Sequence, residues 1–332
     1  MSVLLPFSIL GAPGDDALDV ADVFSTDLYT GNGTSQSITN GVDLSGEGGL
    51  VWIKARSTAT GQVLMDTARG FGNYLSTDGT GGENYAGDLG WGSGSFNSDG
   101  YTVVQGTNGS INANTETFVG WTFRRAPKFF DVVTYTGTGA NRTIAHSLGL
   151  VPGMIIIKRT DTTESWIVYH RSAGVGTYFN KLELNSTGAV FGGTRLWGAG
   201  AGADHTDSEF YLSSANEINA SGGTYVAYLF AHDTSDSGII QCGSFATDGS
   251  GDGSFSLPWL SQWVLLKNAS GTQSWFLVDT TRGNTVYLSP NNSGAESSLG
   301  GSTVTFGASS ISITSFSANS DYIYMAIRAE GA

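Results

Sequence analysis

The segment GMIIIKRTDTTESWIVYHRSAG, residues 153–174, decides the fold of this chain. Two short runs rich in β-branched and aromatic residues flank a polar turn, which is typical of a β-hairpin. The same pattern occurs without a gap in GLVWIKARSTATGQVLMDTARG, residues 49–70. It occurs a third time, with less similarity, in QWVLLKNASGTQSWFLVDTTRG, residues 262–283. We therefore interpret the chain as three copies of one unit.

Three positions recur in register in these hairpins: a lysine, the residue twelve positions later and a glycine sixteen positions later. We expect the lysine and the residue twelve positions on to face each other across the hairpin, as a structural pair worth less than about 1 kcal/mol. A histidine replaces aspartate in the middle copy, so no ion pair is expected to be essential there. The positions are Lys54, Asp66 and Gly70, then Lys158, His170 and Gly174, then Lys267, Asp279 and Gly283.

The likeness extends on both sides of the hairpins, through a Gly-rich turn upstream and an aromatic–aliphatic strand that closes each unit. We place the repeats at residues 28–130, 131–236 and 237–332, of which the third is the most divergent. Residues 1–27 precede them. This segment is expected to be either an extra strand on the first unit or an arm that docks the chain on other proteins by strand addition.

The composition favours β structure. Only 13% of the 332 residues are charged and 48 are glycine, whereas helical proteins use many charged residues and alanine. Turn signals recur at short intervals, and no window has convincing helical periodicity. Units of about 100 residues with short strands have the size of a β-sandwich. We predict an all-β chain of three tandem homologous β-sandwich domains in series, with Gly-rich hairpin turns, each closing its own core. A closed barrel per unit is the alternative.

Charge and cysteine content exclude several classes of function. A net charge of −14 disfavours binding to nucleic acid, because phosphates require a positive surface. Cys242 is the only cysteine, so neither an intrachain disulfide nor a cysteine-based metal site is expected. No positively charged segment precedes the apolar start, and no apolar stretch approaches about 20 residues. We therefore expect no signal peptide and no membrane insertion.

The chain lacks the sequence motifs of serine hydrolases, zinc proteases and nucleotide-binding enzymes. We accordingly predict no catalytic residues, no cofactor and no enzymatic activity. Two acidic clusters have residue types found in metal sites, but a solvent-exposed polar loop or turn explains each of them better. One is Asp248, Ser250 and Asp252, which match the first half of a calcium loop but are followed by Trp259 at the twelfth position. The other is Asp204, His205 and Asp207. His146 and His232 are expected at the surface.

An aromatic residue followed by small residues recurs downstream of each hairpin, at Trp91, Trp197 and Phe306. An exposed ring beside small residues would suit stacking against a sugar. We favour the other interpretation, an aromatic residue that fills the core before a turn, because RLW and VTF resemble strand ends.

The chain resembles a family of phage virion proteins found in marine and cyanobacterial phages. The resemblance rests on DVFSTDLYTGNGTSQSITNGVDLSGEGGLVWIKARS, FVGWTFRRAPKFFDVVTYTGTG, NRTIAHSLGLVPGMIIIKR and TYVAYLFAHD. It covers residues 22–234 strongly and the third unit weakly. It implies a structural component of the particle, commonly described as tail fibre or tail-associated, and it brings no catalytic residues.

We therefore expect a virion protein, assembled in the host cytoplasm, that contacts the host surface as part of a tail fibre or adhesin. Several copies of a module turn weak glycan contacts into avidity. Residues 1–27 would bind other virion proteins, and a homotrimer is expected by analogy with phage fibres. The alternatives are an architectural part of the head, tail or baseplate, and a polysaccharide depolymerase.

Overall fold

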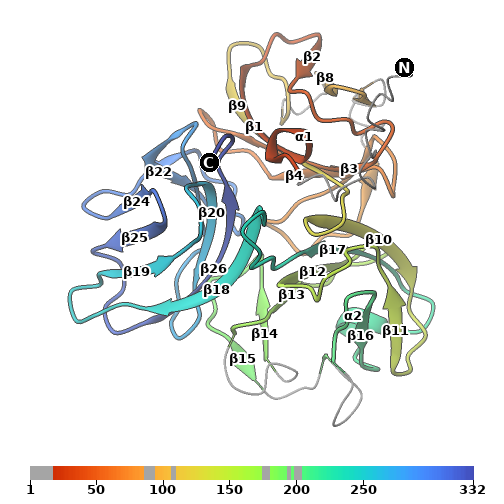
Figure 1. Ribbon diagram of the computed structural model, residues 1–332. Coiled ribbons are helices and arrows are strands. Elements are labelled where there is room, and N and C mark those ends of the chain that lie inside the picture. Colours follow the sequence, from red (N-terminus) through yellow and green to blue (C-terminus); the bar gives the residue numbers. More distant parts are fainter. Residues whose placement is uncertain (1–17, 86–93, 106–109, 174–179, 193–195, 198–203) are drawn as a thin grey trace, which may run out of the picture.

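The computed structural model describes residues 18–85, 94–105, 110–173, 180–192, 196–197 and 204–332. Nearly all regular structure in this part of the chain is antiparallel β-sheet, in three large and three small sheets. No sheet formed by these residues closes into a barrel, which confirms the all-β sandwich class. Figure 1 shows three lobes around a common centre, one for each repeat.

The large sheets share one strand order: an edge strand, the strand that closes the repeat, the two strands of the repeated hairpin, and two short outer strands. In repeat 1 these are β1 (Phe24–Thr30), β9 (Thr117–Arg124), β3 (Gly49–Ala55), β4 (Val63–Asp66), β5 (Asn73–Leu75) and β6 (Asn84–Tyr85). In repeat 2 they are β10 (Phe130–Thr136), β17 (Thr224–Phe230), β12 (Met154–Arg159), β13 (Ile167–His170), β14 (Asn180–Glu183) and β15 (Phe191–Gly192). In repeat 3 they are β18 (Ile240–Ala246), β26 (Asp321–Arg328), β20 (Ser261–Asn268), β21 (Phe276–Asp279), β22 (Gly283–Leu288) and β23 (Ser297–Ser298).

A small sheet accompanies each large one and completes a two-layered unit. Repeat 1 has β2 (Ser35–Thr39), β8 (Gly100–Val104) and β7 (Ser95–Asn97). Repeat 2 has β11 (Arg142–Ala145) and β16 (Glu209–Leu212), together with the short helix α2 (Asn216–Asn219). Repeat 3 has β19 (Gly253–Ser256), β25 (Ser310–Thr314) and β24 (Thr303–Gly307).

Both faces of the central strands are buried, and alternate side chains serve different cores. In β3, Trp52 points into a core shared by all three repeats, whereas Ile53 points into the core between the two sheets of repeat 1. In β20, Leu265 lies in the shared core and Leu266 lies in the core of repeat 3. In repeat 2 the two cores are continuous. This double cover explains why β3 is buried at every position.

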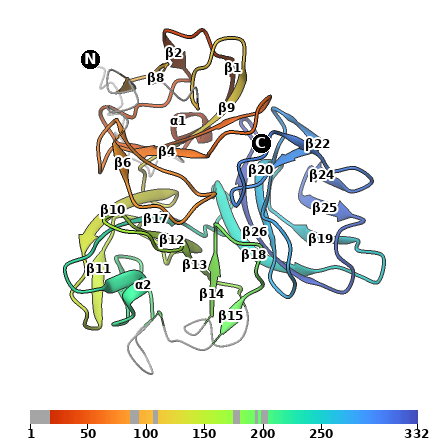
Figure 2. The same ribbon diagram turned by 180° about the vertical axis from the view of Figure 1, so that it is seen from behind.

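The repeats form a closed ring rather than the expected series in which each unit closes only its own core. Figures 1 and 2 show each lobe beside both of the others, so that repeats 1 and 3 are neighbours although they are farthest apart in sequence. Bidentate bonds from Arg56 of repeat 1 to Glu296 of repeat 3, at 3.1 and 2.8 Å, confirm this closure.

The start of the described chain belongs to the first sandwich. The short helix α1 (Val20–Val23) is capped by the Asp19 carboxylate, and β1 follows it directly and pairs with β9 along its whole length. Strand β1 is equivalent to β10 and β18, so the first repeat begins before residue 28. Residues 1–17 of the expected arm lie outside the described residues. None of the helices in the described part is long or apolar enough to span a membrane.

Candidate functional site

The repeated lysines join neighbouring repeats. Each lies on the shared-core face of its strand, is fully buried, and donates from Nζ to one carbonyl of its own repeat and one of the preceding repeat in the ring. Lys158 bonds Glu164 O at 2.8 Å and Thr80 O at 3.1 Å. Lys267 bonds Gln273 O at 2.7 Å and Thr187 O at 3.0 Å, and Lys54 bonds Ala55 O at 2.9 Å and Ser293 O at 3.2 Å.

Burial lowers the pKa of all three lysines to about 8. The ammonium loses water on folding and gains carbonyl dipoles in return, and desolvation is the larger effect. A neutral amine has two N–H donors, which match the two carbonyls that each lysine contacts. The lysine is therefore a connector that tolerates either protonation state.

The position eight residues after each lysine forms a second set of bonds, and like the lysine it donates to a carbonyl of the preceding repeat. Trp166 Nε1 donates to Ser76 O of repeat 1 at 3.0 Å. Trp275 Nε1 donates to Glu183 O of repeat 2 at 3.1 Å. Gln62 Nε2 donates to Ser289 O of repeat 3 at 3.0 Å, so the chemistry is kept although the residue changes.

The position twelve residues after each lysine reaches the following repeat instead. Tyr228 donates to the Asp66 carboxylate at 2.8 Å, and Trp121 Nε1 donates to Asp279 at 3.2 Å. His170 Nε2 lies 3.0 Å from the carbonyl of Tyr324. Each of the three sets of bonds, from the lysine, from the position eight residues later and from the position twelve residues later, therefore joins repeat 1 to 2, 2 to 3 and 3 to 1, as a threefold arrangement requires.

The expected cross-strand pair between these positions and the lysines is wrong. The hairpin register places Asp66 opposite Leu50, and Lys54 lies four residues farther along the strand, roughly 13 Å away at about 3.3 Å per residue. The lysine and the aspartate share a face of the sheet, but each is positioned to meet a different neighbouring repeat. The glycine that follows has a turn function: Gly70 and Gly283 have φ of 89° and 98°. Gly174 lies outside the described residues.

In repeats 1 and 3 the aspartate belongs to a charged cluster that we call the corner of the repeat, formed with the arginine three residues later and a glutamate. Arg69 contacts Asp66 at 2.6 Å and Glu83 at 2.8 Å. In repeat 3, Arg282 contacts Asp279 at 2.6 Å, both side chains being fully buried, and Glu296 at 3.2 Å.

The corner of repeat 2 is neutral at all three positions. His170 replaces the aspartate, Ala173 replaces the arginine, and Val190 takes the place of the glutamate. The last equivalence follows from the backbone, because the N–H of Val190 bonds Ala269 O in the way that the N–H of Glu83 bonds Thr160 O. His170 Nδ1 accepts from the Ser172 N–H, so its proton is on Nε2. Burial lowers the pKa of His170 to about 4.

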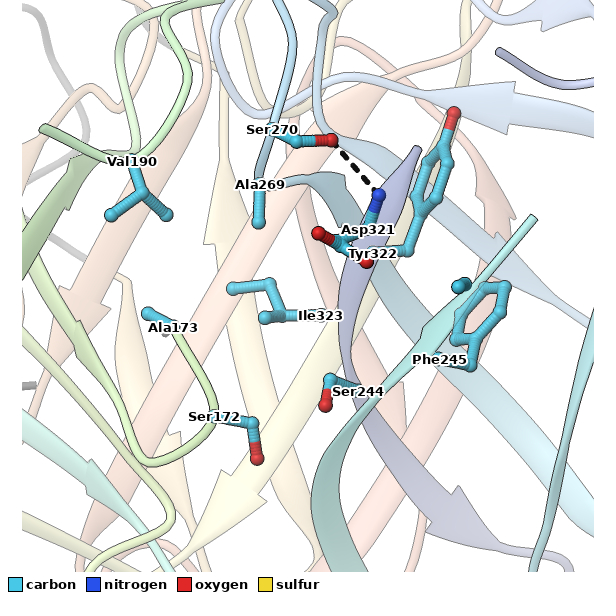
Figure 3. Close-up of a pocket in the computed structure, with 11 residues that line it drawn as sticks. Ser172, Ala173, Val190, Ser244, Phe245, Ala269, Ser270, Asp321, Tyr322 and Ile323 are labelled. Atoms are coloured by element: carbon cyan, nitrogen blue, oxygen red, sulfur yellow. Dashed lines mark hydrogen bonds between the residues drawn. The ribbon is translucent and has the colours of Figure 1, made fainter. Parts of the chain in front are cut away.

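Clefts lie where a corner faces the edge of the next large sheet. The 1–2 cleft, between repeats 1 and 2, has a volume of about 550 Å³ and is lined by the ion pair of Arg69 and Glu83 and by threonines of repeat 2. The 2–3 cleft, between repeats 2 and 3, has a volume of about 450 Å³. Figure 3 shows Ser172, Ala173 and Val190 across from Ser244 and Ile323 in this cleft.

The same place between repeats 3 and 1 is occupied by side chains. There Arg56 binds the Glu296 carboxylate, and Leu28 stands where the other clefts have Thr134 and Ser244. Volumes of about 300–1,000 Å³ are usual for small-ligand sites. The clefts of repeat 2, on its two sides, are therefore the best candidates for binding among the described residues.

The aromatic positions expected to stack on a sugar do not form one site. Trp197 is fully buried, donates from Nε1 to Asn180 O at 3.0 Å and packs on Tyr169, so the core interpretation is correct there. Phe306 is half-buried against the core of repeat 3. Trp91 lies outside the described residues.

The acidic clusters have backbone roles. Asp248 Oδ1 accepts the N–H groups of Ser250 and Asp252 at 2.8 and 3.0 Å, so this carboxylate stabilises its own hairpin turn. In the other cluster Asp204 and Asp207 are exposed, but His205 is buried against Tyr169 and accepts the N–H of Tyr211. The expectation of an exposed loop is wrong for His205.

Two further histidines depart from expectation. His146 is buried, not on the surface, and accepts the N–H of Leu148 at Nδ1. His232 is half-buried and accepts the N–H of Cys242. Burial lowers the pKa of both, that of His232 to about 4. These residues hold local backbone, and each packs closer to the interior than its position at the end of a strand indicated.

The clefts were missed by sequence reasoning because their residues are far apart in the chain. One signal was present in the sequence. Asp66 and Asp279 are each followed three residues later by an arginine, whereas His170 is followed by an alanine, so the aspartate and its arginine are lost together and no buried charge is left unpaired. That pairing of changes marks the corner of repeat 2 as different.

One family model matches the chain, over residues 19–331, and it is described as a domain of unknown function, DUF7483. A search of the curated proteins finds no match.

Proposed function

The chain belongs to the DUF7483 family, and from this premise we propose that it is a non-enzymatic structural protein of a phage particle, a tail-fibre or adhesin-type component that contacts the host surface. The observation that carries the proposal is the closed ring of bonds between repeats. A ring in which every repeat is held by two others suits a component that must stay folded outside the cell.

The buried ionisable groups support a structural role. The lysines with lowered pKa, the aspartates of the two charged corners and His170 all have hydrogen-bond partners in a neighbouring repeat. Perturbed pKa values occur at catalytic sites and in structural networks alike, and hydrogen bonds between repeats favour the structural interpretation. Their geometry serves the assembly of the three repeats.

Binding to the host surface draws support from the clefts. Repeat 2 offers one on each side, and related sites on one rigid body raise the avidity for a repeating ligand such as a surface polysaccharide. Self-association into a homotrimer would multiply the sites further. Sedimentation of the purified full chain measures that oligomeric state directly.

The test locates the protein and then masks it. Antibody raised against the full chain is used to label purified particles of the phage that encodes it, and adsorption to host cells is measured with and without the antibody. We expect labelling on the particle and reduced adsorption. Particles that carry no label overturn the proposal.

Two outcomes would redirect it. Labelled particles that adsorb normally would indicate a purely architectural part of the head, tail or baseplate. Shortened chains after incubation of host polysaccharide with the purified protein would indicate a depolymerase. A control antibody against an unrelated virion protein shows whether bulk on the particle alone blocks adsorption.

A further inference from the structure

We propose that the 2–3 cleft is a binding site for a neutral hexose unit of a polysaccharide. This inference deepens the proposed function and rests on it for its biological setting. The three corners occupy equivalent positions of the three large sheets. In repeats 1 and 3 an arginine–glutamate pair stands at this corner, whereas the described corner residues of repeat 2 carry no charge.

The neutral corner is a coherent set of changes. Without an arginine at position 173, an aspartate at position 170 would be a buried charge with no partner, and such a charge costs several kcal/mol. The chain instead has His170, which is fully buried and neutral, and Ala173 and Val190 beside it. The three changes remove the charges, so the corner side of the 2–3 cleft is apolar where the 1–2 cleft is lined by an arginine and a glutamate.

The open cleft has an apolar floor and a polar rim. Ala173, Val190, Ala269 and Ile323 supply the floor, and Figure 3 shows Ile323 reaching toward Ala173 between the two repeats. The rings of Phe245 and Tyr322 belong to the core of repeat 3.

Hydroxyl and carboxylate groups make the rim. Ser172, Ser244 and Ser270 surround the opening, and Asp321 stands beside them with an exposed side chain. The Ser270 hydroxyl accepts the N–H of Asp321 at 2.9 Å, which orders this side of the rim. The carboxylate of Asp321 is the one charged group among the described lining residues.

This chemistry selects a neutral sugar. A pyranose has an apolar face of C–H groups that can lie on the aliphatic floor, and its hydroxyls can donate to a carboxylate and exchange hydrogen bonds with serines. The described lining residues include no arginine or lysine, and the chain carries a net charge of −14, so an acidic sugar would be repelled.

Variants copied from the other repeats should make the cleft less suited to a neutral sugar. The triple variant His170→Asp, Ala173→Arg and Val190→Glu replaces the apolar corner side of the cleft with the charged corner of repeats 1 and 3. Ser244→Leu places in the rim the residue that repeat 1 has at Leu28, and Thr134→Leu is its matched control in the 1–2 cleft. Asp321→Asn keeps the shape of the rim and removes its charge.

The measurement is a titration of the full chain, labelled at isoleucine methyl groups, with the methyl glycosides of glucose, galactose and N-acetylglucosamine, and with glucuronic acid as the charged comparison. We expect one or more neutral glycosides to shift the Ile323 methyl signal, with glucuronic acid at least tenfold weaker. Ser244→Leu and the triple variant should weaken binding at least tenfold, Asp321→Asn should weaken it severalfold, and Thr134→Leu should leave it unchanged.

An Ile323 signal that moves with none of the neutral glycosides overturns the inference, as does binding that survives both Ser244→Leu and the triple variant. If the triple variant does not fold, Ser244→Leu decides. Failure here is distinguishable from failure of the proposed function, because labelling of the particle does not depend on the cleft. Conversely, glycoside binding by a protein that is absent from particles would leave the site standing and remove its proposed setting.

Discussion

The corners of repeats 2 and 3 lie at equivalent places after the repeated hairpin. Both bond a neighbouring repeat, one with a buried ion pair and the other with a neutral side chain. In repeat 3 a fully buried Arg282 binds Asp279, and Asp279 also accepts the indole N–H of Trp121. In repeat 2 a neutral imidazole bonds a carbonyl, with an alanine beside it. The comparison teaches that the ring needs a hydrogen bond at this position but does not need a charge.

The largest expected effect is that of Asp279→Ala. The change leaves the Arg282 guanidinium buried and without its nearest carboxylate, which should lower the free energy of unfolding by about 3–5 kcal/mol in urea titrations. The double variant Asp279→Asn with Arg282→Ala keeps an acceptor for the Trp121 N–H, leaves Glu296 bound to Arg56 and has no unpaired charge, so it should recover most of the loss. A double variant as unstable as Asp279→Ala would contradict the inference that this position needs a hydrogen bond and no charge.

The neutral corner should be the weaker one in acid. The pKa of His170 is about 4 in the folded chain and about 6.5 in the unfolded chain. Between these values the unfolded chain binds more protons, so the contribution of the neutral imidazole to the free energy of unfolding is complete above pH 6.5 and is lost as the pH falls toward 4. The loss amounts to roughly 3 kcal/mol at most for this group. Urea titrations from pH 7 to pH 4 should show a shallower decline for His170→Gln than for the wild type. Equal declines in the free energy of unfolding for the two proteins would contradict a lowered pKa of His170.

The lysines do not differ between the corners and provide a reference. Lys158→Met leaves two carbonyls from two repeats without a donor, which should lower the free energy of unfolding by about 1–3 kcal/mol. Lys54→Met and Lys267→Met should have similar effects, whatever the charge of the corner nearby. Asp236→Asn, at an exposed position, is the control and should change stability by less than about 0.5 kcal/mol. Three unequal effects would show that the corners influence the lysines.

The smallest effect concerns alkaline pH. The folded pKa of Lys267 is about 8 and its unfolded pKa about 10.4, so between these values the unfolded chain binds more protons and stability rises with pH. The difference in free energy of unfolding between the wild type and Lys267→Met should therefore grow by about 1 kcal/mol from pH 8 to pH 9. A difference that is constant over this range would mean that the buried amine does not titrate there.

Local sequence determined most of the architecture. The repeated hairpins predicted the strands β3–β4, β12–β13 and β20–β21, because β-branched residues, turn residues and fixed spacing are local signals. They also marked Lys54, Lys158 and Lys267 as equivalent, and the structure places all three in equivalent contacts. The same signals could not show which partner each lysine meets, and the cross-strand pairing with Asp66 failed for that reason.

The burial of His205 illustrates the other limit. In sequence it stands in a stretch rich in polar residues, which is typical of an exposed loop, yet its ring packs on Tyr169. A local pattern reports what a segment prefers and not what other segments cover it. The candidate site failed to emerge for the same reason, since the 2–3 cleft joins residues 172 and 321 from two repeats.

The sequence by itself determined the strands, their triplication and the pairing of changes at positions 170 and 173, because strand alternation, turns and charge balance depend on residues close together in the chain. Only the tertiary structure decided that the three sandwiches close into a ring and share a core, and that clefts lie on the two sides of repeat 2. Ring closure is fixed by which buried donors find carbonyls on another repeat, and those partners lie 78 to 239 residues away along the chain.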